Sequence, residues 1–161
     1  MSLLPEYLTE SLLTSSSTKN TKVFSPTNKL SYGRIPAAPA FNIEAGEVYL
    51  RLGLVGKFVK KGQPKLGAFG ARHIWDKHRS DLNLQYPSDI PKVVASILRN
   101  GADVLVDKSK SAVKPLVLNS NVGIVILQPK KTAEGGIEYS IVSAYGRRNH
   151  KGTVIGQLLH T

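Results

Sequence analysis

The sequence predicts an α+β domain in which two helices pack on one face of a four-stranded antiparallel sheet, preceded by an extended N-terminal arm. Two observations lead to this fold class. Between residues 88 and 100 the apolar residues recur at helical spacing, whereas after Gly101 they alternate with a period of two. Short segments of turn-forming residues separate the β-type runs, and short turns favour antiparallel neighbours.

We expect residues 1–42 to form a leader or arm that is largely irregular, and residues 43–161 to form the folded domain. Residues 14–21 are rich in Ser, Thr and Lys, and Pro36 and Pro39 flank alanines in a segment that favours extended backbone. We expect residues 14–40 to add little to the core. The arm could wrap the domain, reach a partner or be the remnant of a larger protein.

The domain begins with a β-rich run and a basic segment. Residues 48–55 are mostly apolar and fit a strand, although the residues that precede them also permit a helix. Residues 57–65 hold four lysines with a glycine and a proline. This composition predicts a basic loop close to the phosphate backbone of a ligand. A merely solvated loop remains the alternative.

Two helices are predicted next. The run after Gly70, as far as Arg79, fits a short helix. The second helix has clearer ends, since Ser88 or Asp89 can cap it, a proline follows in its first turn and Asn100-Gly101 can stop it. Its apolar face consists of Ile90, Val93, Val94, Ile97 and Leu98.

The sheet is predicted from four runs with a period of two. They cover residues 102–107, 114–119, 123–128 and 137–145. Their short connections predict a meander. Residues 153–159 could add either a helical turn or an edge strand.

Composition narrows the class of partner. The 161 residues include 22 Lys and Arg against 11 Asp and Glu, which gives a formal charge of +11. Such a balance favours nucleic acid, an anionic membrane surface or an acidic protein. Without cysteines the chain can form neither a disulfide framework nor a zinc–thiolate site. No apolar run reaches the roughly 18 residues of a membrane-spanning helix.

Residues 65–78 concentrate the chemistry of the chain. They contain two of the four histidines and the single tryptophan. On a helix, His73 and Lys77 share one face, and an imidazole beside a fixed cation suits proton transfer at a phosphate. The alternative is a basic surface helix that buries Trp75 and gives its histidines no role.

Two motifs carry a resemblance to a known family. They are Phe-Gly-Ala-Arg-His-Ile-Trp-Asp-Lys-His on the first helix and Ile-Val-Ser-Ala-Tyr-Gly on the last strand. Over about residues 65–148 the chain resembles the barnase–EndoU–colicin–RelE superfamily of small ribonucleases, in the branch found in bacteriophage proteins and bacterial toxin modules. There a Gly-x-x-His-Ile run opens the first helix and a Thr/Ser-x-Tyr pattern closes the last strand.

The resemblance implies a metal-independent endoribonuclease without a cofactor. Such enzymes attack the scissile phosphate with the adjacent 2′-hydroxyl and leave a 2′,3′-cyclic phosphate. It implies RNA as substrate, with tRNA as one candidate, and a toxin or phage effector that acts in the cytoplasm of a bacterial cell.

The resemblance also implies site residues. His73 would be the base or acid, Lys77 would support the phosphate, Ser143 would hydrogen-bond a phosphate oxygen, and Tyr145 would stack on a base or share proton transfer. His78 is either a second acid or base, or a residue that packs behind Ile74. The residues expected to bind substrate are Arg72, Arg147, Arg148, Lys60 and Lys61.

Partners and rival classes follow from the same features. An acidic immunity or inhibitor protein would fit a basic cleft, and the arm could join a virion or a larger toxin assembly. A non-catalytic nucleic-acid-binding module and a phage structural protein on the same fold remain alternatives. No metal site is expected, because His73 and His78 are five residues apart and Asp76 and Asp81 complete no convincing ligand set.

Overall fold

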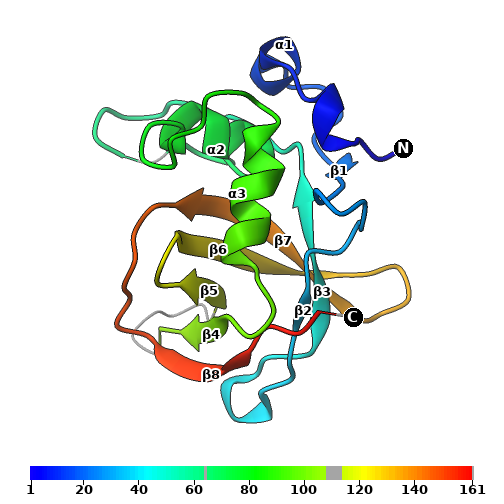
Figure 1. Ribbon diagram of the computed structural model, residues 1–161, viewed down its shortest axis with the longest axis vertical. Helices are drawn as coiled ribbons and strands as arrows, with labels where there is room; N and C mark the ends of the chain where they lie inside the picture. The colour runs from blue at the N-terminus through cyan, green and yellow to red at the C-terminus, as the bar shows by residue number, and fades with distance from the viewer. Residues whose placement is uncertain (64, 108–113, 161) are drawn as a thin grey trace.

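The computed structural model describes residues 1–63, 65–107 and 114–160. These residues form one mixed sheet of eight strands, covered by helices (Figure 1). Seven strands follow the order β1-β3-β7-β6-β5-β4-β8, and β2 pairs with β3 off this path. The predicted fold class, a four-stranded antiparallel sheet with two helices, is therefore wrong.

The described residues contain three α-helices. They are α1 (Glu10–Thr14), α2 (Gly70–His78) and α3 (Asp89–Ile97), and two 3-10 turns, η1 (Pro5–Tyr7) and η2 (Pro39–Phe41), lie in the N-terminal region. The two predicted helices correspond to α2 and α3. None of the helices in these residues has the length and apolar character that crossing a membrane requires.

The predicted meander is present within the larger sheet. The strands β4 (Asp103–Val106), β5 (Leu116–Asn119), β6 (Gly123–Lys131) and β7 (Ile137–Tyr145) pair in sequence order, all antiparallel. β8 (Thr153–Gln157) pairs antiparallel with β4. The tail is thus an edge strand, one of the two alternatives for it.

Three strands that precede α2, together with β8, account for the wrong fold class. β3 (Gly46–Arg51) runs parallel to β7, with Val48 opposite Tyr139. β1 (Lys22–Val23) and β2 (Arg34–Ile35) pair antiparallel with β3. β1 and β2 were not predicted, because two residues are too few to show a period. Residues 48–55 fitted a strand, but local pattern did not indicate its pairing with β7, which is about 90 residues away.

The main core lies between the sheet and the helices. Figure 1 shows α3 crossing one face of the sheet, with α2 next to the end of β7. Apolar side chains of α2 and α3 pack there against alternate residues of the strands. The members from these elements include Ile74, Trp75, Ile90, Val94, Ile97, Val117, Val125 and Leu127.

A smaller cluster forms on alternate strand positions. Leu105, Leu116 and Ile124 are buried there, and Tyr145 is among the half-buried residues packed against them. Because neighbouring residues of a strand point to opposite faces, this cluster lies on the sheet face away from α3. Tyr145, at the end of β7, stands at the rim of that face.

The N-terminal arm is part of the core. Val23 and Ile35 are fully buried and Tyr32 is 3% exposed. The expectation that residues 14–40 add little to the core is therefore wrong. A boundary at residue 42 stays a prediction.

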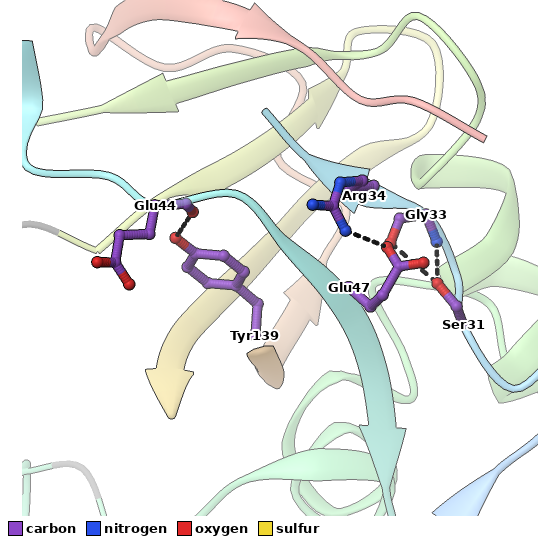
Figure 2. Close-up of polar contacts among 6 residues, drawn as sticks. All are labelled: Ser31, Gly33, Arg34, Glu44, Glu47 and Tyr139. Atoms are coloured by element: carbon purple, nitrogen blue, oxygen red, sulfur yellow. Dashed lines mark hydrogen bonds and ion pairs between the residues drawn. The ribbon is translucent and has the colours of Figure 1, made fainter. Parts of the chain in front are cut away.

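Polar contacts also tie the arm to the sheet (Figure 2). Arg34 and Glu47 face each other across β2 and β3, with Nη1 3.7 Å from Oε2. Ser31 Oγ donates a hydrogen bond to the Gly33 carbonyl at 3.0 Å. In the segment before β3, the Glu44 carbonyl accepts a hydrogen bond from the Tyr139 hydroxyl, which fixes this segment on β7.

Candidate active site

The position of α2 is set where it crosses the end of β3. Gly70 has φ of +76°, and a Cβ there would lie 2.5 Å from the Arg51 carbonyl oxygen. The Arg72 N–H donates to the Leu52 carbonyl at 2.8 Å. Since β3 is the neighbour of β7 in the sheet, this joint places α2 beside the end of β7.

Two histidines of α2 and a tyrosine of β7 form what we call the His–Tyr cluster: His73, His78 and Tyr145. The ring centres of His73 and His78 lie 5.4 Å apart in an edge-to-face arrangement. Those of His78 and Tyr145 lie 5.1 Å apart. Segments remote in sequence therefore bring three proton-carrying side chains together.

Asp81 links the end of α2 to the end of β7. Its Oδ1 lies 3.3 Å from Nδ1 of His78. Its Oδ2 accepts a hydrogen bond from the Gly146 N–H at 2.8 Å. Sequence reasoning considered this aspartate only as a metal ligand and missed the link, although the spacing of three from His78 is a local signal for such a pair.

Both histidines of the cluster are neutral in the free protein near pH 7. The pKa of His73 is lowered to about 4, mainly by burial and then by the charges of His78 and Lys77. Burial also lowers the pKa of His78, against the opposing effect of Asp81. A neutral imidazole can accept a proton, and a bound anion would favour its protonated form.

Cations surround the cluster. Lys77 is exposed and its charge acts on both histidines. The Arg147 guanidinium lies 5.9 Å from the centre of the Tyr145 ring. Lys65 Nζ is 2.9 Å from Asp76 Oδ2 on α2, and the charge of Lys65 also lowers the pKa of His73. The cluster is thus suited to an anionic ligand.

Tyr145 is a hydrogen-bond donor at neutral pH. Burial raises the pKa of its phenol above the usual value near 10, and Arg147 only partly opposes this. The phenol therefore keeps its proton near pH 7 and can donate it to an oxygen of a ligand.

Ser143 lies two residues before Tyr145 but is not hydrogen-bonded to the cluster. It is 6% exposed, and its hydroxyl has no hydrogen-bond partner among the described residues. Residues two apart on a strand share a face. A role for this hydroxyl on a phosphate oxygen stays a prediction.

The predicted substrate-binding residues lie in different surroundings. Arg72 is fully buried, and its Nε and Nη1 donate to the carbonyls of Leu12 and Gly53 at 3.0 and 2.9 Å. This position does not suit contact with a substrate. Lys60, Lys61 and Arg148 are exposed.

The cavities near the arm do not include the cluster. A cavity of about 630 Å³ lies between the arm and the C-terminal end of α3, and its lining includes Tyr32, Leu98 and His160. His160 Nε2 is already hydrogen-bonded to the Leu98 carbonyl at 2.6 Å. We place the candidate site at the His–Tyr cluster, because proton carriers and cations meet there.

Neither a metal site nor a similarity to a known protein adds a functional assignment. In the ranges 1–63, 65–107 and 114–160, no three His, Asp or Glu side chains gather as a metal site would require. No protein-family model, curated protein or solved structure matches the chain. The resemblance to the ribonuclease superfamily therefore depends on the residues of the two motifs.

Proposed function

We propose that this protein is a metal-independent endoribonuclease that cleaves RNA through its 2′-hydroxyl and leaves a 2′,3′-cyclic phosphate. The observation that carries the proposal is the meeting of His73 and His78 with Tyr145. The two motifs behind the resemblance lie on α2 and β7, so their convergence is what such a site would need.

His73 is suited to act as the base. Its lowered pKa keeps the imidazole neutral over a wide range of pH, and it can take the proton of the 2′-hydroxyl. The freed 2′-oxygen then forms a bond to phosphorus, while the bond between phosphorus and the 5′-oxygen breaks. General acid–base catalysis of this kind contributes about 10²–10⁴-fold.

His78 is suited to act as the acid. Burial lowers the pKa of His78 in the free protein, but Asp81 beside Nδ1 opposes this shift, and a bound phosphate would also favour the imidazolium form. The imidazolium gives its proton to the departing 5′-oxygen. The products are a 2′,3′-cyclic phosphate on one RNA fragment and a 5′-hydroxyl on the other.

Lys77 and Arg147 would hold the non-bridging oxygens of the phosphate, and the phenol of Tyr145 can donate a hydrogen bond to the same group. Fixed donors and cations aimed at developing charge are each worth about 10²–10³-fold. A basic site of this kind also fits an acidic inhibitor protein, as a toxin or phage effector acting inside a bacterial cell would require.

The test is cleavage of total tRNA in the presence of EDTA by wild type, His73→Ala and His78→Ala. We expect wild type to produce fragments with cyclic phosphate ends, and His73→Ala to lose at least about 10²-fold in rate with little change in RNA affinity. For wild type, the acid limb of kcat/KM should lie near pH 4, since it reports the base of the free enzyme.

His150→Ala is the matched control, because His150 lies outside the His–Tyr cluster and its Nδ1 accepts a hydrogen bond from the Gly152 N–H at 2.9 Å. It should cleave as wild type does. Binding of RNA without cleavage would instead support the non-catalytic nucleic-acid-binding alternative. Cleavage that is unchanged in His73→Ala would refute the mechanism.

A further inference from the structure

The segment between β3 and α2 forms a basic loop, by which we mean residues 57–63, 65 and 66. Its two sides are joined where Lys57 and Leu66 exchange backbone hydrogen bonds, each 2.9 Å long. A second bridge joins Leu54 to Phe69, directly before α2. The loop therefore projects as a short antiparallel strap with a defined base.

The basic loop exposes apolar side chains as well as charge. Phe58 is 68% exposed, Val59 is 65% exposed and Leu66 is 70% exposed. Lys57, Lys60 and Lys61 are exposed beside them. Neighbouring exposed apolar side chains rimmed by polar residues are typical of interaction sites, and the lysines beside them favour a ligand that carries negative charge.

The base of the loop lies at the candidate active site. Lys65 is paired with Asp76 of α2, and its charge acts on His73. The loop continues directly into α2, and Lys65 brings a positive charge from the base of the loop within electrostatic reach of His73. The loop and the cluster can thus share one extended ligand.

We infer that the basic loop binds single-stranded RNA, with Phe58 as a stacking platform for an unpaired base and the flanking lysines on its phosphates. The inference rests on the proposed function and names its substrate class. Stacking on an aromatic ring suits single strands, because the bases of a duplex are already stacked inside the helix and hidden from the ring.

Binding is measured in the His73→Ala background, so that the RNA stays intact, with fluorescence anisotropy at fixed salt. The probes are an unstructured RNA of about 10 nucleotides and the same sequence as a duplex. We expect the single strand to bind more tightly. Phe58→Ala should weaken its binding about 5- to 100-fold, and Phe58→Trp should restore it.

Val59→Ala is the matched control, because Val59 is the neighbour of Phe58 and about equally exposed but has no ring on which a base could stack. It should change affinity by less than about 2-fold. Equal binding of single strand and duplex, or no effect of Phe58→Ala, would overturn the inference. So would Phe58-dependent binding to phosphatidylserine vesicles together with RNA binding that is independent of Phe58.

The two proposals can fail separately. If wild type cleaves RNA but Phe58→Ala binds single strands normally, only the stacking inference fails. If RNA binding depends on Phe58 while wild type never cleaves, the proposed function fails and the loop is a binding surface on a non-catalytic protein.

Discussion

Arg72 provides a sharp test of whether a cation of α2 serves the fold or a ligand. Its side chain is fully buried and donates from two different nitrogens to the carbonyls of Leu12 and Gly53. One carbonyl belongs to α1 and the other to the joint between β3 and α2. Replacing Arg72 with methionine keeps much of its length and removes both hydrogen bonds.

The cost can be worked from these contacts. A hydrogen bond to a charged group contributes about 1.5–3 kcal/mol, so two give about 3–6 kcal/mol. Part of this is recovered, because methionine has no guanidinium to dehydrate and the Arg72 Nη2 has no hydrogen-bond partner among the described residues. We expect Arg72→Met to lower the free energy of unfolding by about 3 kcal/mol.

The assay is equilibrium unfolding in urea, combined with hydrogen exchange of residues 1–14. Arg72→Met should lose protection in α1, since Leu13 is fully buried beside this anchor. Arg79→Met is the matched control near the end of the same helix. That arginine is exposed over the Trp75 ring at 4.7 Å, and its loss should cost less than about 1 kcal/mol.

One result would refute this reasoning. If Arg72→Met unfolds at the same urea concentration as wild type but binds RNA much more weakly, the guanidinium acts on a ligand. The structural role of Arg72 would then be wrong, and the substrate-binding role expected from sequence would be right.

Three further perturbations test the joint and the cluster. Gly70→Ala forces a Cβ against the backbone at a positive φ and should destabilise the fold by about 1–3 kcal/mol or more, measured in urea. Asp81→Asn keeps a hydrogen-bond acceptor but removes the charge that raises the pKa of His78, so NMR titration should show a lower pKa for that ring, and an unchanged value would contradict the pairing. Because the pKa of His73 is about 4 in the folded protein and near the ordinary 6.5 in the unfolded chain, the unfolded chain binds more protons between these limits, and stability should fall as pH drops through this window. Urea midpoints should show a shallower fall in His73→Ala, and equal slopes would argue against the burial of His73.

Local pattern predicted α2, α3 and the meander because their signals lie within a few residues. The apolar face of α3 reports burial directly, and the apolar residues of β5 and β6 are buried on both faces of the sheet. By contrast, the parallel pairing of β3 with β7 joins residues about 90 positions apart, as with Val48 and Tyr139. No short window contains both partners, so the mixed sheet could not be predicted from the pattern.

The candidate site was predictable to the extent that its motifs are local. His73 and His78 lie on one short helix, and the resemblance pointed to Tyr145 on the last strand of the meander. The hydrogen bond from Gly146 to Asp81 and the burial of Arg72 are long-range features. A charged residue on a short basic helix ordinarily faces solvent, so nothing in its neighbours indicated that Arg72 would be buried.

The parallel pair of β3 and β7 also bears on when the cluster can form during synthesis. β3 is translated about 90 residues before its parallel partner β7. Until residues 137–145 have emerged, β3 has no parallel neighbour and His78 has no Tyr145 to meet. Pairing between segments so distant in sequence is also slow. A growing chain therefore carries its histidines and lysines before the cluster exists, and the proposed activity begins only after β7 has been translated.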